Sequence, residues 1–376
     1  MSLRHVSTAP LVGLACAGVV LYAFSERSLA PVHSEAYEQK LQAVRLVQRA
    51  QEAIREAKRE RNVAVDRRND PESTGLIGPQ FTLITTDRGT QAAKSIAAHP
   101  NFGAAVTQMM LQAGVDRGDL VAIGMTGSLP GQNIAVLAAC RVIGAEPVVI
   151  TSVGSSMFGA TDPEMTWLDM ESVLSGRKIL PYRSVAASLG GGGDVGRGLS
   201  PAGRSLIGDA ARRNGVRLLE IESLLDAVRE RVAVYDLASA SRKKPIALYV
   251  NVGGGSASLG GTQNARLIPA GLTRHLAGRN YPNRGVINIL AERGIPVLHL
   301  LEVESLARSL GITDESGDTV EPGRGLLFVK YRYNLLIVGA STVLLLGANL
   351  LVLRLDIRQQ LLGRPHPERT VNREVP

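Results

Sequence analysis

Cysteine, aromatic residues and metal-ligand patterns are scarce in this chain of 376 residues. Its two cysteines, Cys16 and Cys140, both lie in apolar segments, so no disulfide framework is expected. Aromatic residues make up 4% of the chain and leave few platforms on which single-stranded nucleic acid could stack. No spaced cluster of His and Cys predicts a metal site. The net charge of +8 is spread along the chain, which also argues against a nucleic-acid partner.

The sequence also lacks a nucleotide fingerprint. Its Gly-rich stretches carry no P-loop lysine, and no acidic residue closes the apolar stretch VVITS, where a dinucleotide ribose would be held. A nucleotide-dependent synthetase is therefore disfavoured, and no cofactor is expected.

An uncharged apolar run occupies residues 335–353 and is flanked by Lys330, Arg332 and Arg354. At 1.5 Å per helical residue, its length of about 19 residues is enough to cross a hydrocarbon core of ~30 Å. A buried core helix of this length usually carries at least one charge. The run is therefore predicted to be a transmembrane helix.

A second apolar run covers residues 9–24 and follows Arg4 and His5. This pattern fits either a signal peptide or an uncleaved anchor. Pro31 directly follows the small-residue site at residues 28–30 and is expected to hinder cleavage, which favours an uncleaved anchor.

The basic tail at residues 354–376 is predicted to lie in the cytoplasm, because positive charge gathers on that side of a membrane. With residues 1–8 also inside, two crossings of the plasma or inner membrane place the central domain outside the cytoplasm. Lys330 and Arg332 on the outer flank oppose this orientation without reversing it.

Between the anchors, residues 34–62 form one charged helical pattern, and residues 75–325 alternate strand-like with helix-like segments. The first segment fits either a helix docked on the domain or a self-associating stalk, which leaves a homo-oligomer open. The second predicts an α/β domain with a Rossmann-like, mostly parallel sheet.

Three units carry the α/β prediction. In residues 119–152, LVAIG and VVITS read as strands around the helix QNIAVLAACRVIG. A helix capped by Ser200, with Pro201 in its first turn, precedes the predicted strand VRLLEI. In residues 245–301, the strands IALYVNV and IPVLHLL flank the helix RGVINILAERG.

Four Gly/Ser-rich stretches, at residues 124–133, 152–156, 189–198 and 253–261, are expected at the edge of the sheet where strands end. Glycine lets backbone N–H groups approach an anion, so a shared site for carboxylate or phosphate is expected, although each stretch could be an ordinary turn. Asp194 and Arg197 are the preferred binding residues, because flexible glycines give charged side chains little packing role. The predicted ligand-binding residues are Thr126, Gly127, Ser128, Gly131, Asn133, Ser155, Asp194, Arg197, Gly254, Gly255, Ser256 and Ser258.

Ser128 is the candidate nucleophile, because it follows a strand and precedes a helix, although it lacks a Gly-x-Ser-x-Gly elbow. His299 is the candidate base, with Asp169 or Asp194 to orient it. Each has an alternative structural role: Ser128 as a helix cap or ligand contact, and His299 as a packed core residue.

The segment TDPEMTWLDME predicts a helix that Pro163 begins and that Thr161 or Asp162 caps. This prediction places Asp169 about a turn and a half into the helix, near Trp167.

The stretches GMTGSLPGQNIAVLAA, TDPEMTWLDME, GGGGDVGRGLSPAGR and NVGGGSASLGG, with the two terminal apolar runs, resemble the bacterial poly-gamma-glutamate system protein family. The resemblance covers most of residues 34–334. It implies a role in the synthesis or export of poly-gamma-glutamate, as capsule or exopolymer, together with a cytoplasmic-side amide ligase and a small membrane protein. The implied partners are those membrane subunits and the gamma-glutamyl polymer.

The resemblance implies a pathway rather than a reaction, so two hypotheses remain. The chain is either an accessory component whose loops bind gamma-glutamyl carboxylates or partner subunits, or a serine-dependent hydrolase or transferase that uses Ser128.

Overall fold

The computed structural model describes residues 9–314 and 316–362. The chain forms two compact units: Ser34–Phe328, and the described parts of Met1–His33 and Val329–Pro376. The predicted cytoplasmic end at residues 1–8 and the tail from residue 363 lie outside the described residues.

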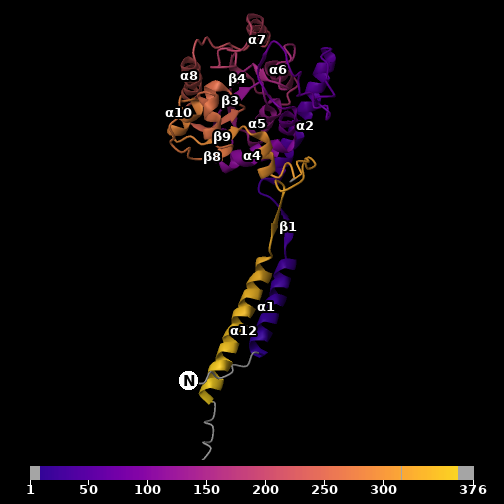
Figure 1. Cartoon of the computed structure of the whole chain (residues 1–376), viewed down its shortest axis with the longest axis vertical. Coiled ribbons are helices and arrows are strands. Elements are labelled where there is room, and N and C mark those ends of the chain that lie inside the picture. Colours follow the sequence, from indigo (N-terminus) through magenta and orange to yellow (C-terminus); the bar gives the residue numbers. More distant parts are fainter. Residues whose placement is uncertain (1–8, 315, 363–376) are drawn as a thin grey trace, which may run out of the picture. The chain divides into compact units, whose positions relative to one another are not determined.

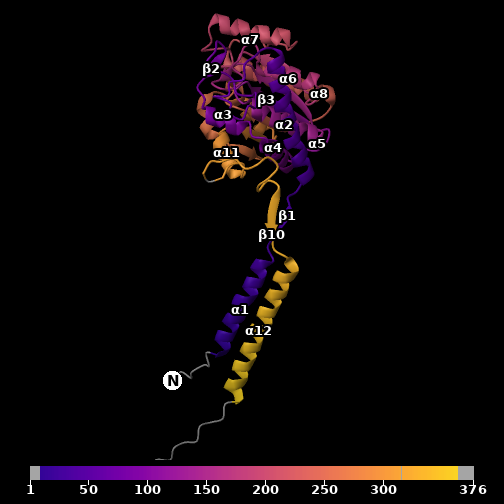
Figure 2. The same ribbon diagram turned by 90° about the vertical axis from the view of Figure 1, so that its right-hand side faces the viewer.

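The unit made from the two ends of the chain pairs two helices and two strands. Helix α1 (Ala9–Arg27) lies beside α12 (Leu335–Leu362), and β1 (Ala30–His33) pairs antiparallel with β10 (Val329–Arg332) (Figures 1 and 2). Helix α1 and the segment Leu335–Arg354 of α12 are long and apolar enough to cross a membrane, by length and composition.

The other unit is a mixed α/β domain built on a six-stranded sheet. Five strands run parallel, and β8 at one edge is antiparallel to β9. In spatial order the strands are β6 (Ser184–Ser188), β4 (Glu146–Ser152), β3 (Leu120–Thr126), β7 (Ile246–Val252), β9 (Val297–Leu300) and β8 (Gly271–Thr273). From β3 the chain runs through β4 to β6 on one side, and β7 and β9 lie on the other. The strand order therefore changes direction between β3 and β7.

Helices cover both faces of this sheet. All seven residues of β3 are buried, and successive side chains of a strand point to opposite faces. Leu120 and Ala122 pack in one cluster with Val228 and Tyr235 of α8 and with Val286 of α10. The helices of this domain are α2 (Tyr37–Glu60), α3 (Gln91–Ala97), α4 (Asn101–Gln112), α5 (Pro130–Ile143), α6 (Trp167–Gly176), α7 (Pro201–Arg213), α8 (Leu224–Arg242), α9 (Ser256–Leu259), α10 (Val286–Glu292) and α11 (Val303–Ser309).

Helix α2, predicted as either a docked helix or a stalk, packs on the domain. It contacts α4 and α5, and Val44, Val47 and Ile54 on its apolar stripe are buried. A Cβ atom at Gly103 of α4 would lie 2.9 Å from Val47 Cγ2, so glycine there lets the two helices approach closely.

Most predicted elements are confirmed. The strands β3, β4, β7 and β9 and the helices α5, α7 and α10 form where the patterns placed them. Ser200 caps α7 as predicted, because its side chain accepts a hydrogen bond from Gly203 N–H at 3.1 Å. Gly144 ends α5 with a φ of 84°, a conformation that glycine adopts without strain.

The predicted start of the helix around Trp167 is wrong. Pro163 lies in a turn, and α6 begins at Trp167 behind the cap Thr166. Thr166 and Asp169 form a reciprocal capping box, whereas the hydroxyl of Thr161 donates to the carbonyl oxygen of Pro79.

The predicted strand VRLLEI is also wrong, because only Leu218 in this stretch makes a β-bridge, to Ala187 of β6. Conversely, β6 and α8 were not predicted. The sequence of β6, SVAAS, is short and contains small residues, which gives a weak strand signal. A further short pair joins β2 (Thr85–Asp87) to β5 (Ser155–Ser156).

Candidate functional site

A pocket of about 810 Å³ opens at the edge of the sheet where the parallel strands end. Its lining includes a residue at or just after the end of each parallel strand. These residues are Gly190 after β6, Ser152 of β4, Thr126 of β3, Gly253 after β7 and Leu301 after β9. All four Gly/Ser-rich stretches thus contribute to one pocket, which is the usual place for a ligand in an open α/β sheet.

The loop after β7 exposes backbone N–H groups between β3 and β7, where the strand order reverses. Gly253 has a φ of 86°, and a Cβ atom there would lie 2.4 Å from Thr126 Oγ1, so only glycine fits. Gly254 faces open space, and no described residue accepts a hydrogen bond from the N–H groups of Gly254 and Gly255. Exposed N–H groups of this kind can bind an anion.

A buried ion pair lies beneath the pocket. Arg231 of α8 donates to Asp194 Oδ2 through Nη2 at 2.8 Å and Nε at 3.1 Å. Ser152 and Ser188 donate to Asp194 Oδ1 at 2.7 and 2.8 Å, and both side chains of the ion pair are buried. Burial alone would lower the pKa of Arg231, but the charge of Asp194, the hydrogen bonds that it accepts from Arg231 and the nearby Tyr235 and Tyr249 together outweigh burial and raise that pKa.

The two preferred binding residues therefore lie in different surroundings. The Asp194 carboxylate is already saturated by Arg231 and two hydroxyl groups, so its main role is to hold the loop between β6 and α7. Asp194 has a φ of 66°, a conformation that aspartate tolerates better than most residues. Arg197 lines the pocket, is exposed and forms no ion pair with any described residue.

A buried lysine and two serines form one corner of the pocket. Lys94 Nζ of α3 donates to Ser156 Oγ at 2.8 Å and to the carbonyl oxygen of Ser128 at 2.6 Å. Ser128 Oγ accepts a hydrogen bond from Ser156 N–H at 3.0 Å. Burial lowers the pKa of Lys94 to about 8, against the opposing effect of Asp87.

The predicted triad of Ser128, His299 and Asp169 is not formed: within the described residues, no hydrogen bond joins any two of these side chains. His299 is buried in β9, between β7 and the edge strand β8, where its Nδ1 contacts Asn251 Nδ2 at 2.9 Å and its Nε2 has no described partner. Burial lowers the pKa of His299 to about 4, and the residue does not line the pocket. Its surroundings match the structural alternative.

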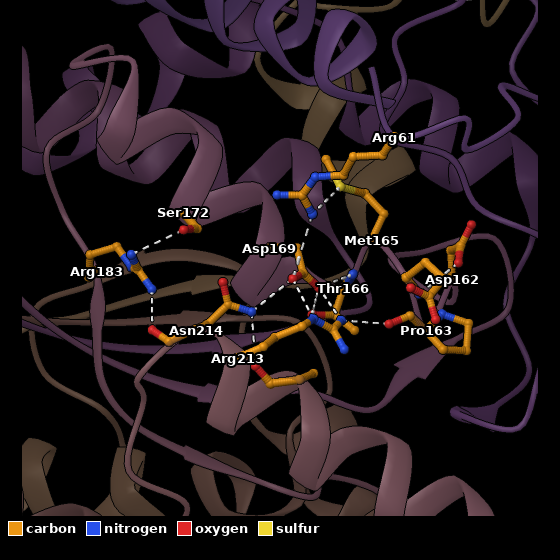
Figure 3. Close-up of polar contacts among 12 residues, drawn as sticks. Arg61, Asp162, Pro163, Met165, Thr166, Asp169, Ser172, Arg183, Arg213 and Asn214 are labelled. Carbon is orange, nitrogen blue, oxygen red and sulfur yellow. Dashed lines mark hydrogen bonds and ion pairs between the residues drawn. The ribbon is translucent and has the colours of Figure 1, made fainter. Parts of the chain in front are cut away.

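Asp169 has a structural role at the junction of α6 with α7 (Figure 3). Arg213 donates to Asp169 through Nη2 at 2.5 Å and Nε at 2.8 Å, and Thr166 and Asn214 also donate to it. Burial raises the pKa of Asp169, but these hydrogen bonds outweigh it and the pKa is lowered. Like Asp194, Asp169 has its acceptor capacity taken up within the fold.

Seven of the twelve predicted ligand-binding residues line the pocket: Thr126, Ser128, Asp194, Arg197, Gly254, Gly255 and Ser256. The other five pack behind it. Gly127 and Gly131 lie against the backbone of residues 153 and 97, and Asn133 Nδ2 donates to Thr126 O at 2.9 Å. Ser155 Oγ donates to Gly127 O, and Ser258 Oγ lies 2.8 Å from Tyr249 Oη.

Sequence reasoning missed three residues that shape this site: Lys94, Ser156 and Arg231. Lys94 occurs in the stretch TQAAKSIAAH and Arg231 in LLDAVRERVAV, where each resembles an ordinary charged position on a helix surface. Ser156 was included in a Gly/Ser-rich stretch but was not singled out. No local signal in the sequence distinguishes these two charged residues from solvent-exposed ones.

The chemistry of the lining is mixed. Arg88, Lys94 and Arg197 supply positive charge, and Asp87, Glu302 and Glu304 supply negative charge. No group of three or more His, Cys, Asp or Glu side chains within the described residues is placed to hold a metal ion. Comparisons with family models, curated proteins and solved structures found no match to this chain.

Proposed function

We propose that this chain is a membrane-anchored accessory component of poly-gamma-glutamate synthesis or export, and that its pocket binds carboxylates of the gamma-glutamyl chain. The observation that carries this proposal is the convergence of four Gly/Ser-rich stretches with Arg88, Lys94 and Arg197 on one pocket. The assignment to the poly-gamma-glutamate pathway rests on the resemblance of those stretches to the poly-gamma-glutamate system protein family.

The chemistry of a gamma-glutamyl chain fits this lining. Each of its residues carries a free α-carboxylate, which guanidinium groups and exposed N–H groups both recognise. One end of the chain also carries an ammonium group, for which Asp87, Glu302 and Glu304 supply partners. The reversal of strand order between β3 and β7 supports a Rossmann-like sheet with its ligand at that point.

The two apolar helices support a two-pass anchor in the plasma or inner membrane. The basic residues after Leu353 in the sequence favour an α/β domain outside the cytoplasm. In this arrangement the domain lies on the side of the membrane to which the polymer is exported. Membrane subunits of the synthesis complex are the proposed protein partners.

Binding is tested with the full chain in detergent micelles and gamma-linked glutamate oligomers, by calorimetry at low salt. Because Arg197 is exposed and has no ion-pair partner among the described residues, Arg197→Gln should weaken binding about tenfold without unfolding the domain. Arg217→Gln is the matched control, since Arg217 is also exposed but does not line the pocket. Equal weakening by both variants, or no binding at all, would contradict the proposal.

The orientation is tested by labelling intact cells with a maleimide that does not cross membranes. Cys140 is buried, so Cys16→Ser with Leu237→Cys leaves one accessible thiol, at a position that is 71% exposed on α8. Labelling before lysis is expected. Labelling only after lysis would place the domain in the cytoplasm.

A further inference from the structure

The corner formed by Lys94, Ser128 and Ser156 has an arrangement that ligand binding alone does not require. A buried amine lies 2.8 Å from a serine hydroxyl that lines the pocket, and no described residue forms an ion pair with that amine. A Cβ atom at Gly89 would lie 3.3 Å from both Lys94 Cε and Ser156 Oγ. Glycine at position 89 therefore keeps this corner open.

We infer that Ser156 is a nucleophile and Lys94 its general base, so that the pocket carries out acyl transfer on an amide. Serine nucleophiles activated by lysine are an established alternative to the Ser-His-Asp arrangement. The choice of a gamma-glutamyl amide as substrate rests on the proposed function, whereas the identity of the nucleophile does not.

Geometry favours Ser156 over Ser128 as the nucleophile. The amine contacts the hydroxyl of Ser156 but only the backbone carbonyl of Ser128. Ser128 Oγ instead accepts the N–H of Ser156, which leaves its own hydrogen free to donate to a developing oxyanion in the pocket. Ser128 is thus assigned as an electrostatic stabiliser.

Hydrolysis of the amide needs water as its only co-reactant. Ser156 Oγ attacks the amide carbon, its proton passes to neutral Lys94, and a tetrahedral oxyanion forms. The C–N bond then breaks as Lys94 returns that proton to the leaving amine. Water next attacks the acyl ester, Lys94 takes a proton from that water, and Ser156 leaves with the proton.

The charged surroundings suit a base that is neutral in part of the protein molecules near neutral pH. Burial lowers the pKa of Lys94 to about 8, and the facing charge that opposes this effect is Asp87 of β2. The other charged residues of the pocket lining are Arg88, Asp194, Arg197, Glu302 and Glu304. A rate that rises with pH toward about 8 is therefore expected.

The first test uses a fluorophosphonate probe on the full chain in micelles, with mass spectrometry to locate the label. Label on Ser156 is expected, labelling should be at least about a hundredfold slower in Lys94→Arg, and Ser205→Ala should change nothing. Ser205 is an exposed serine of α7 away from the pocket. Label on Ser128 instead, or no label on either serine, would overturn the inference, and the wild-type peptide map decides this even if Ser156→Ala fails to fold.

The second test incubates gamma-linked glutamate oligomers with the full chain and follows their length by mass spectrometry. Shortened or transferred oligomers are expected with wild type and none with Ser156→Ala, which should still bind them. Binding with no turnover, together with no probe labelling, would overturn the catalytic inference and leave the binding proposal standing. Probe labelling of Ser156 without oligomer binding would instead reject gamma-glutamyl chains as the ligand.

Discussion

Of two buried cations, Lys94 lines the pocket and Arg231 lies beneath it, and their surroundings differ. Arg231 donates two hydrogen bonds to Asp194 and further ones to Ser152 and Ser188, so its charge is matched within the fold. Lys94 is almost as well buried, but it contacts one hydroxyl and one carbonyl oxygen and no carboxylate. The pKa of Arg231 is raised by its partner, whereas burial lowers the pKa of Lys94 to about 8.

The comparison separates a structural charge from a chemically available one. Burying a charge is unfavourable unless protein groups replace the hydrogen bonds to water that are lost. In a fold under selection for stability alone, each buried cation would be paired with a carboxylate. A charge left without a carboxylate at the wall of a pocket is typical of functional sites, where pKa values are shifted. The contrast therefore supports different roles for the two residues.

The largest expected effect comes from breaking the matched pair. Arg231→Ala leaves the Asp194 carboxylate buried without its cation, so the free energy of unfolding should fall by about 3–5 kcal/mol. Chemical denaturation of the full chain in micelles measures this change.

The double variant Asp194→Asn with Arg231→Met removes both charges, keeps at position 194 a residue that tolerates a φ of 66°, and should recover most of the lost stability. A single variant Arg231→Ala as stable as wild type would remove the distinction drawn between the two cations.

A buried carboxyl group without a hydrogen-bonded cation extends the comparison to acids. Glu171 accepts hydrogen bonds from Trp167 Nε1 and from the N–H and hydroxyl of Ser184, and burial raises the pKa of Glu171 to about 7. Between the ordinary value of 4.5 and about 7, the folded protein holds a proton that the unfolded chain releases. Its stability should therefore fall across that range by about 3 kcal/mol, since one pKa unit corresponds to about 1.4 kcal/mol.

Glu171→Gln tests this linkage through the slope of stability against pH. The stability of the variant should not fall between about pH 4.5 and 7, and below about pH 4.5 the variant should be less stable than wild type because an amide nitrogen cannot accept the Ser184 N–H. An unchanged slope would show that another group titrates in this range.

Much of the sheet could be predicted, because its signals are local. The stretches of β3, α5 and β4 carry apolar periodicity and a C-terminal glycine within about 30 residues of chain. The convergence of the four Gly/Ser-rich stretches followed from one general rule about the carboxyl ends of parallel strands. The start of α6 was less certain, since both Thr161 and Thr166 are good caps and only the pairing of Thr166 with Asp169 decides between them.

The site chemistry could not be predicted, because it depends on pairs that are distant in sequence. Lys94 and Ser156 are 62 positions apart, and Asp194 and Arg231 are 37 apart. Neither Lys94 nor Arg231 differs in its local sequence from a charge on a solvated helix face. Their burial follows from how α3 and α8 pack, and that packing is a property of the whole domain. The family resemblance and the membrane orientation stay predictions.

The smallest expected effect has the opposite sign to the first. At about pH 7 the folded state holds the Lys94 ammonium against a pKa lowered from 10.5 to about 8, so its burial opposes folding. Lys94→Met removes that charge but also removes two hydrogen bonds. Because the first effect is the larger, the free energy of unfolding should rise by about 1–2 kcal/mol. Because the unfolded chain binds more protons between about pH 8 and 10.5, wild-type stability should increase over that range and the variant should not share the increase. Thermal unfolding of both proteins at about pH 7 and about pH 10 measures both effects. A variant less stable than wild type at pH 7 would mean that Lys94, like Arg231, is held in place for stability.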